Sequence, residues 1–431
     1  MVARPLVRYL LGLPEIEVSL ADQVEGKAEH LVKGHARGKA LVIDLNNEDA
    51  LRREIAAADL VVSMVPYVFH PVVARHCLAL KKNMVTTSYV GEAMRGLDAA
   101  VREAGLIFLN ETGLDPGIDH MEAMRVIDRV KAEGGRVLSF ISWCGGLPAP
   151  EANTNPFGYK FSWSPLGVLL ASKNDARYKW EGREVFLPAE KLFDHPALIA
   201  IEGLTEFEGY PNRNSLPYID VYGIPDVKTM LRGTLRYNGW CSTLRRMIRL
   251  GLLDQEEQGW GGQTYQDFLK RIVNAAAEKA GTTVPADFRK AVDSDLFEKL
   301  AWLGLSSDEP LPVTKGSALD ILAGRMIPML AYAAGERDMI ILQHQFIADY
   351  PGVGRPPDKI TSTLVDYGIP HADSSMSRTV GLPAAISARL VLEGRIKEKG
   401  VHIPVKPGIY GPILEELENQ GIVFREKRER L

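Results

Sequence analysis

The feature that most constrains the fold is the regular alternation of strand and helix patterns over roughly the first quarter of the chain. Apolar runs at residues 40–43 and 59–65 predict buried strands, and helical periodicity follows at 48–58 and 72–80. Strands that alternate with helices of this length are typical of a parallel, doubly wound sheet. We therefore expect residues 1–120 to form an α/β, Rossmann-like dinucleotide-binding domain.

The remainder of the chain has a different style. From residue 137 onward the sequence is rich in Gly, Pro, Asn, Tyr and Trp, with long irregular connections. It predicts an α+β domain with a mixed sheet over residues 121–371, which carries a helical insert at about 254–335. Helical periodicity returns at 379–392 and 409–419, and we expect these C-terminal helices, within 372–431, to complete the first domain.

The N-terminus lacks the usual start of such a sheet, a strand followed by a glycine-rich turn that meets a pyrophosphate. The chain begins instead on a helical pattern, in which Ala3 fits the last position of a G-x-G-x-x-G/A fingerprint. We expect the first strand and the glycine loop to be missing from this sequence as given, and dinucleotide binding by it to be poor. Asp22 ends the next strand, where an acid binds the adenine ribose; a helix N-cap is the other interpretation.

The most chemically loaded segment is the turn at residues 110–121, called here the acid turn, with the sequence NETGLDPGIDHM. It follows a buried strand pattern and precedes a helix, so it lies at the sheet edge where open α/β folds bind ligands. Asp115 and His120 are candidates for proton chemistry. Asp115-Pro116-Gly117 also makes a good structural turn, and Asp119 and Glu122 suit the start of a helix.

The bulk composition excludes several classes of protein. The 431 residues are 46% hydrophobic and 25% charged, with a formal net charge of -4, which gives no reason to expect nucleic acid or an anionic membrane as partner. No apolar run approaches the ~20 residues that cross a bilayer. The three cysteines form no zinc-spaced pair and no disulfide framework, so we expect no metal and a cytoplasmic location.

Five motifs occur in order along the chain. Beyond the acid turn they are residues 144–151 (CGGLPAPE), 155–164 (NPFGYKFSWS), 210–215 (YPNRNS) with 232–237 (RGTLRY), and 373–383 (DSSMSRTVGLP). Together they closely resemble the glutamate-forming saccharopine dehydrogenases, also called saccharopine reductases. The resemblance covers nearly the whole chain from Met1.

The resemblance implies both a fold and a reaction. The fold is a Rossmann domain followed by a domain for substrate binding and dimerisation, so a homodimer is expected. The expected partners are small amino-acid substrates, and the expected pathway is lysine metabolism or amino-acid biosynthesis. The reaction interconverts L-saccharopine with L-glutamate and L-2-aminoadipate 6-semialdehyde, through an imine that NAD(P)H reduces. The sequence does not show whether the direction is lysine synthesis or breakdown.

The resemblance also implies site residues. It places Tyr89, Asp115 and Cys144 near the reacting nitrogen. Saccharopine carries three carboxylates, which guanidinium forks bind well, so Arg213 and Arg236 are the expected clamp. Further substrate contacts are expected from Ser88, Tyr89, Asn214 and Thr234, and cofactor contacts from Val2, Ala3, Asp22, Val65, Pro66, Ser88, Leu114 and Asp115. Neither His70 nor His120 is assigned as the general base.

Cofactor preference follows from one side chain. A carboxylate at Asp22 accepts from both ribose hydroxyls and repels a 2'-phosphate, so NAD(H) is favoured. Lys27, one turn on, keeps NADP(H) open.

Two other functions stay open at this point. A carboxynorspermidine reductase-type imine reductase would bind a diamine and a single amino-acid head group. A truncated, non-catalytic homologue would follow from loss of the cofactor loop.

Overall fold

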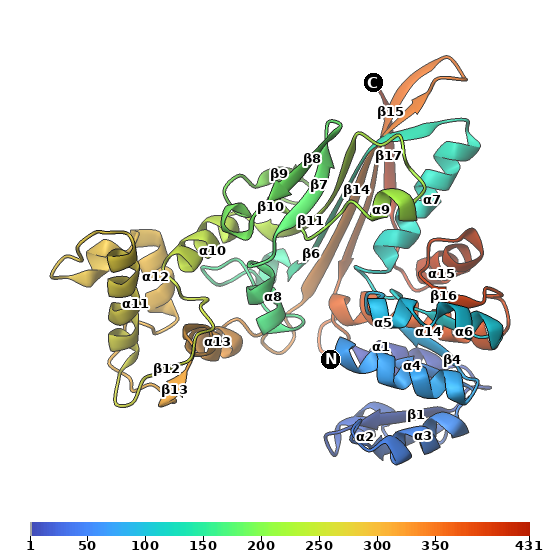
Figure 1. Ribbon diagram of the computed structural model, residues 1–431, viewed down its shortest axis with the longest axis horizontal. Helices are drawn as coiled ribbons and strands as arrows, with labels where there is room; N and C mark the ends of the chain where they lie inside the picture. Colours follow the sequence, from blue (N-terminus) through green and yellow to red (C-terminus); the bar gives the residue numbers. More distant parts are fainter. Residues whose placement is uncertain (1) are drawn as a thin grey trace. The chain divides into compact units, whose positions relative to one another are not determined.

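The computed structural model describes residues 2–431, which divide into two compact units (Figure 1). Unit 1 comprises residues 1–139, 218–226 and 342–431, and unit 2 comprises 140–217 and 227–341. These limits differ from the predicted division at residues 120 and 371. The difference arises because helix α7 (Ile118–Ala132) packs on α15 (Pro407–Asn419), and because β15 (Arg355–Tyr367) pairs with β17 (Arg425–Arg430).

Unit 1 contains the parallel strands that the N-terminal alternation predicts. A group of four has the order β16-β5-β4-β3, in register at Leu60↔Asn83, Met84↔Phe108 and Gly400↔Ile107. Its strands are β3 (Leu60–Ser63), β4 (Asn83–Thr86), β5 (Ile107–Leu109) and β16 (Gly400–His402). The C-terminal region thus adds a strand as well as the helices that were expected.

A separate parallel pair consists of β1 (Val18–Asp22) and β2 (Gly38–Val42). Within residues 2–431 no strand pairs with both β1 and β3, so the parallel strands form two sheets. The two faces of the group of four carry different helices. Met84 and Phe108 pack with apolar residues of α3 (Glu48–Ala57) and α4 (His70–Ala79), whereas α14 (Ser375–Leu392) contacts β3, β4 and α1 (Ala3–Leu11).

Helix α1 packs against the long apolar helix α14. A Cβ added at Gly381 would lie 2.7 Å from the carbonyl oxygen of Val2, so the glycine permits close approach of the two helices. The remaining elements of unit 1 are α2 (Lys27–Val32), η1 (Tyr67–Phe69), α5 (Glu92–Arg95), α6 (Asp98–Glu103) and α9 (Tyr218–Val221).

A nine-stranded sheet is the second large feature of the chain. Its order is β17-β15-β14-β6-β11-β10-β9, with β7 paired to β11 and β8 paired to β7. The pairs β15–β17, β10–β11, β9–β10, β7–β11 and β7–β8 are antiparallel. The strands not yet bounded are β6 (Arg136–Pro148), β7 (Ala176–Trp180), β8 (Arg183–Leu187), β9 (Ala197–Ala200), β10 (Glu206–Pro211), β11 (Thr229–Tyr237) and β14 (Asp338–Tyr350).

One edge of this sheet is formed by the charged strand β17. The terminal strand β17 reads REKRER and is fully exposed, a charged edge of the kind that discourages pairing with other chains. The sheet as a whole, with the parallel strands, confirms the predicted α/β class.

The helical insert of unit 2 begins with well-formed caps. Thr264 and Asp267 make a capping box at α11 (Tyr265–Lys279), and Ser317 and Asp320 make another at α13 (Ala318–Met329). The other elements of unit 2 are η2 (Pro150–Ala152), α8 (Pro165–Ala171), η3 (Ala189–Lys191), α10 (Trp240–Arg249), β12 (Gln258–Gly259), η4 (Phe288–Ala291), α12 (Ser294–Trp302) and β13 (Lys315–Gly316). Within residues 2–431 no helix is long and apolar enough to cross a bilayer.

Candidate active site

Tyr89 and Asp115 meet at the carboxyl ends of two neighbouring parallel strands. Tyr89 follows β4 and Asp115 lies in the acid turn after β5, and the Tyr89 hydroxyl donates to Asp115 Oδ1 over 3.0 Å. Within residues 111–120 Asp115 alone is not buried, and Tyr89 is 41% exposed. The structure therefore presents this phenol–carboxylate pair at the sheet edge where ligands bind in open α/β folds.

The rest of the acid turn is internally bonded. Thr112 Oγ1 donates to Thr86 O over 3.1 Å, and Gly117, at φ +149°, brings its backbone against Gly113. Asp119 does not cap helix α7, whose N-cap is Gly117, but lies in its first turn and accepts from the Gly117 amide over 2.6 Å. Asp115 is thus carried on a loop whose shape its neighbours fix.

His120 and Glu122 are more than helix-start residues. His120 is fully buried, with Nε2 2.8 Å from Glu111 Oε2 and Nδ1 2.7 Å from the Tyr222 hydroxyl. Glu122 is also buried, and it accepts from Ser362 Oγ over 2.5 Å and pairs with Arg125 at 2.6 Å. Burial raises the pKa of Glu122 to about 7. Only the tertiary contacts identify these two residues as interior, polar and bonded.

A second buried histidine connects the ends of β3 and β4. His70 Nδ1 lies 2.8 Å from Ser63 Oγ, and Nε2 lies 2.8 Å from Ser88 Oγ and 3.3 Å from Thr86 Oγ1. Burial lowers the pKa of His70 to about 4, so the ring is neutral at physiological pH. A neutral imidazole with both nitrogens bonded to hydroxyls orients Ser88, which directly precedes Tyr89.

The residues predicted to contact a cofactor are distributed around this edge of unit 1. Val65 and Pro66 follow β3 and lead into Tyr67 and Val68, which are 75% and 55% exposed. Leu114 is buried beside Asp115. Exposed apolar side chains directly after a parallel strand suit the flat face of a nucleotide ring.

Helix α1 begins at Ala3 with Val2 as its N-cap. Val2 makes no side-chain cap and the first turn holds no acid, so the helix start can accept an anion. Asp22, at the end of β1, is half-buried and accepts from the Val24 amide over 2.8 Å. It is not an N-cap, because α2 begins at Lys27 with Gly26 as its N-cap.

Unit 2 presents a different kind of group, a buried arginine on β11. Arg236 is 6% exposed, lies 5.0 Å from the Tyr159 ring centroid and 5.7 Å from that of Trp240, and donates to Leu235 O over 2.7 Å. Its Nε has no hydrogen-bond partner in residues 2–431, and no Asp or Glu of that range forms an ion pair with it. A buried guanidinium without an anionic partner destabilises the folded protein through its desolvation, unless a ligand anion pairs with it.

The nearest acid in the sheet is used elsewhere. Glu208 of β10 is directly opposite Arg236, but its two oxygens accept from the amides of Gly239 and Cys241 over 2.9 and 2.8 Å, at the start of α10. Burial raises the pKa values of Tyr159 and Tyr210, so both phenols stay neutral beside the guanidinium. The positive charge of Arg236 is therefore left uncompensated within its unit.

Alternation along β11 places further polar groups beside Arg236. Arg232 and Thr234 share its face of the strand because they are four and two residues away. Thr234 is directly opposite Tyr210 of β10 in the sheet, and Arg232 is 7% exposed. The sequence marks Arg232 only as part of a motif, although the period-2 alternation of residues 232–236 already predicts that it shares a strand face with Arg236.

The other predicted substrate residues of unit 2 are less buried than Arg236. Cys144, on β6, is half-buried and close enough to interact electrostatically with Arg236. Arg213 is exposed, in a left-handed conformation at φ +52°, and its neighbour Asn214 uses Oδ1 to accept from the Leu216 amide. The structure therefore groups Cys144, Thr234 and Arg236 in unit 2, and Ser88, Tyr89 and Asp115 in unit 1.

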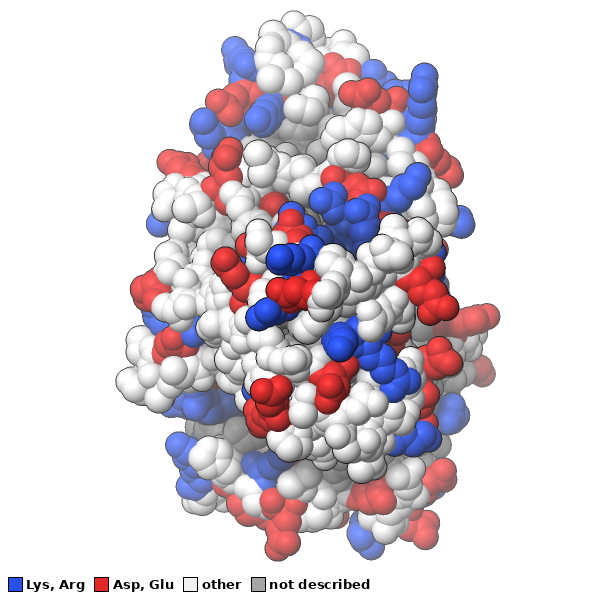
Figure 2. Space-filling view, turned by 90° about the vertical axis from the view of Figure 1, so that its left-hand side faces the viewer, with Lys and Arg blue, Asp and Glu red and all other residues white. Residues whose placement is uncertain are grey.

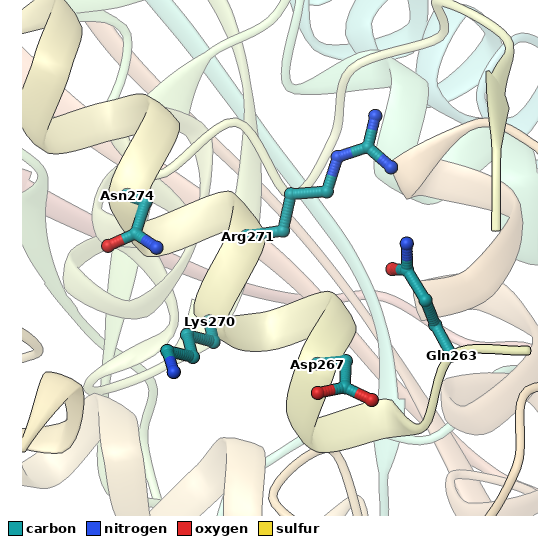
Figure 3. A pocket seen from close by; sticks show the side chains of 5 residues that line it. All are labelled: Gln263, Asp267, Lys270, Arg271 and Asn274. Carbon is teal, nitrogen blue, oxygen red and sulfur yellow. The ribbon is translucent and has the colours of Figure 1, made fainter.

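Other features of the surface do not coincide with these residues. A hollow on α11 is lined by Gln263, Asp267, Lys270, Arg271 and Asn274 (Figure 3), none of which belongs to the predicted site. The Arg271 guanidinium there lies 4.4 Å from the Trp260 ring centroid and donates to Gly259 O and Gln258 Oε1. Within the described range, no group of three His, Cys, Asp or Glu is arranged to hold a metal.

Comparison with known proteins gives a consistent result over the whole length. Residues 1–109 match the family described as the saccharopine dehydrogenase NADP binding domain, and residues 113–422 match the saccharopine dehydrogenase C-terminal domain. The chain is 38% identical to the saccharopine dehydrogenase (NADP(+), L-glutamate-forming) of Saccharomyces cerevisiae, over 99% of this chain and 97% of that protein.

Two further similarities concern a longer relative and a solved structure. The chain is 38% identical to the mitochondrial alpha-aminoadipic semialdehyde synthase of Bos taurus, and spans 46% of that protein, about half its length. The apo, histidine-tagged saccharopine dehydrogenase (L-Glu forming) from Saccharomyces cerevisiae superposes with a TM-score of 0.90 at 37% identity, covering 99% of this chain and 97% of that one. On these grounds the chain belongs to the saccharopine dehydrogenase family.

Proposed function

We propose that this chain interconverts L-saccharopine with L-glutamate and L-2-aminoadipate 6-semialdehyde, through an imine reduced by NAD(P)H, in lysine metabolism. The observation that carries the proposal is the similarity to the yeast L-glutamate-forming enzyme, which extends over 99% of this chain and 97% of that enzyme. The pairs of polar groups in the two units support it chemically, because the reaction needs both carboxylate recognition and proton transfer.

Carboxylate recognition falls to the arginines of unit 2. Arg236 offers a buried guanidinium that lacks an anionic partner in residues 2–431, and a substrate carboxylate supplies one. Thr234 adds a hydroxyl on the same strand face. Arg213 and Asn214, on an exposed turn, are proposed for a second carboxylate of the substrate.

Proton transfer falls to the Tyr89–Asp115 pair of unit 1. Formation and hydrolysis of an imine require protons to move on and off the substrate nitrogen. Asp115 balances the positive charge of the amine or iminium. The Tyr89 hydroxyl donates to that carboxylate over 3.0 Å in the free protein, and can donate its single proton to the substrate nitrogen instead when that nitrogen is a neutral amine or imine. Cys144 is proposed as a further contact to the substrate.

The residues present fit a nicotinamide dinucleotide. The uncapped start of α1 at Val2 and Ala3 suits a phosphate, and Val65 and Pro66 lead into the exposed apolar surface of Tyr67 and Val68. Ser88, Leu114 and Asp115 border the same edge of the sheet. When bound, the reduced nicotinamide supplies the hydride.

We propose that Asp22 favours NAD(H) over NADP(H), because its half-buried carboxylate repels a 2'-phosphate. The names of the binding-domain family and of the yeast relative give NADP, so this point separates the chain from them. The test is the ratio of kcat/KM for NADH and NADPH in the parent and in Asp22→Ser. The ratio should exceed one in the parent and fall in the variant; a parent preference for NADPH overturns the assignment.

The partners are proposed to be small amino-acid substrates and a second copy of this chain. Lys, Arg, Asp and Glu are interspersed over the face drawn in Figure 2, which does not favour a polyanion there. Light scattering on the purified protein should give twice the chain mass of 47.6 kDa. A cytoplasmic location is proposed, and imaging of a fluorescent fusion tests it.

The decisive experiment for the reaction is oxidation of NAD(P)H followed by absorbance. Oxidation should require glutamate and the semialdehyde together, and the reverse reaction should reduce the cofactor with saccharopine alone. Equal rates when a simple diamine replaces glutamate would indicate a carboxynorspermidine reductase-type enzyme instead. Omitting glutamate is the internal control, because reduction of the free aldehyde would also consume cofactor.

A further inference from the structure

Glu111 occupies an unusual position directly beneath the segment that carries Tyr89. Its backbone amide donates to Ser88 O over 3.2 Å, and its carboxylate oxygen Oε1 accepts from the Val90 amide over 2.9 Å. Glu111 therefore binds the residues on both sides of Tyr89. Its own backbone adopts a left-handed conformation at φ +57°, which costs a non-glycine residue free energy and persists where surrounding contacts fix it.

The second carboxylate oxygen of Glu111 contacts the buried residue His120. Oε2 lies 2.8 Å from His120 Nε2, while His120 Nδ1 lies 2.7 Å from the Tyr222 hydroxyl. Because a carboxylate oxygen only accepts, His120 Nε2 donates to Glu111, while Nδ1 also lies 3.5 Å from Asp119 Oδ2. The His120 ring also stacks on Tyr218, with centroids 5.4 Å apart.

The three residues are buried, at 4%, 0% and 1% exposure for Glu111, His120 and Tyr222. The side chain of Glu111 bonds the backbone next to Tyr89 and the ring of His120. A buried, mutually bonded chain of polar groups fixes geometry, since moving any one of them leaves another unsatisfied. Its position suits orientation of Tyr89 rather than chemistry on a substrate.

We propose that Glu111, His120 and Tyr222 are positioning residues that hold the Ser88–Val90 segment so that Tyr89 meets Asp115. The inference rests on the proposed function in that it assigns Tyr89 and Asp115 to the reacting nitrogen. Glu111 acts on the backbone of residues 88 and 90, His120 fixes the carboxylate, and Tyr222 fixes the imidazole.

The test compares two substitutions of Glu111. Glu111→Asn tolerates a positive φ but is too short to reach Val90 and His120, and should lower kcat about 100-fold while the KM for the cofactor stays unchanged. Glu111→Gln keeps an acceptor for the Val90 amide and a group that can bond His120, and should retain most of the activity. Glu103→Asn, an exposed carboxylate on α6, is the matched control and should not differ from the parent.

A positioning role predicts that the effect depends on Tyr89. In the Tyr89→Phe background Glu111→Asn should lower kcat far less than in the parent, because the group it orients is already absent. An equal loss in both backgrounds, or no loss in the parent, overturns the proposal. If Glu111→Asn does not fold, Tyr222→Phe replaces it, with a smaller loss of kcat expected in the parent and none in the Tyr89→Phe background.

A readout independent of turnover separates this proposal from the proposed function. With 3-fluorotyrosine at position 89, the ¹⁹F resonance should be single in the parent and in Glu103→Asn, and broadened or split in Glu111→Asn. That result in a protein that does not use saccharopine would refute the proposed function alone. An active parent whose ¹⁹F resonance and kcat are both unaffected by Glu111→Asn would refute the positioning proposal alone.

Discussion

The acid turn of unit 1 and the β11 face of unit 2 both bury charged groups, but Glu111 of the acid turn and Arg236 of β11 differ in the partners that their charges find within the protein. In the acid turn the buried Glu111 is bonded to His120 and to the Val90 amide, and the half-buried Asp115 is bonded to Tyr89. On β11, Arg236 is buried beside neutral rings, and the acid opposite it is bound to the start of α10. The polar groups of the acid turn are thus bonded within the protein, whereas the charge of Arg236 has no acidic partner in residues 2–431.

The buried cation Lys160 of unit 2 differs from Arg236, because its charge is paired. Lys160 is also buried, at 5% exposure, but its ammonium is bonded to both carboxylate oxygens of Glu336, at 2.7 and 2.5 Å. Removal of a paired cation leaves its partner unsatisfied, whereas removal of an unpaired one relieves a desolvation cost. Stability and activity should therefore respond differently to changes at these two cations.

The largest expected effect is at Arg236. Arg236→Met should lower kcat/KM for saccharopine about 1000-fold, in line with the ~2–5 kcal/mol lost when a buried charge pair with a ligand is truncated. Thermal unfolding of the free protein should occur at the same or a higher temperature, because an uncompensated buried charge is removed.

Lys160→Met is the control for this contrast, and should lower the free energy of unfolding by about 2 kcal/mol. Comparable destabilisation by the two substitutions would contradict the view that Arg236 is incomplete without a ligand.

The next effect concerns the pH dependence of stability through His70. Burial lowers the pKa of this imidazole to about 4 from 6.5, so the unfolded chain binds its proton at a higher pH than the folded protein does. The stability that His70 contributes is therefore present above about pH 6.5 and is lost as the pH falls toward 4. From pH 7 to 4 the parent should lose about 3 kcal/mol more than His70→Asn, measured by denaturant unfolding; equal losses would place the acid sensitivity elsewhere.

Asp115→Asn tests the other half of the comparison. It should lower kcat about 100-fold, because the neutral amide no longer balances charge on the substrate nitrogen, and should leave the KM for saccharopine nearly unchanged. Combined with Tyr89→Phe the loss should be less than the product of the single losses, since the two side chains share a hydrogen bond. A rise in KM with constant kcat would instead assign Asp115 to substrate binding.

The smallest expected effect is at Ser88. Ser88→Ala removes the hydroxyl 2.8 Å from His70 Nε2 and should cost about 1 kcal/mol of unfolding free energy. The pKa of His70, followed by NMR titration, should remain low, because burial is the cause of its shift. A return of that pKa to its ordinary range would show that Ser88, and not burial, keeps the ring neutral.

Much of the architecture was predictable from short-range patterns. The strand and helix periodicity of the first 109 residues predicted β2, β3 and the strands that follow, and the five ordered motifs predicted the family that the comparisons confirm. The limits of the units were not predictable, because residues 218–226 and 342–431 join unit 1 through contacts made far along the chain.

For the candidate site, the sequence likewise predicted individual residues but not their partners. Local chemistry drew attention to Asp115 in its turn and to Arg236 in its motif. It did not show that Glu208, opposite Arg236, is committed to α10, nor that Glu111 is bonded to both Val90 and His120. Pairing partners that are 21 to 31 residues apart, such as Glu111 with Val90 and Glu208 with Gly239, depend on strand order and register.

The sequence by itself determined the fold class, the family and the types of residue available for an imine-reducing reaction, because hydrophobic period and motif spacing are properties of neighbouring residues. The tertiary structure alone decided which of those polar groups find partners within the described residues, as Glu111 does, and which do not, as with Nε of Arg236. The physical reason is that the free energy of a buried charge or hydrogen-bonding group depends on the partners that the fold brings to it, and those partners come from distant parts of the chain.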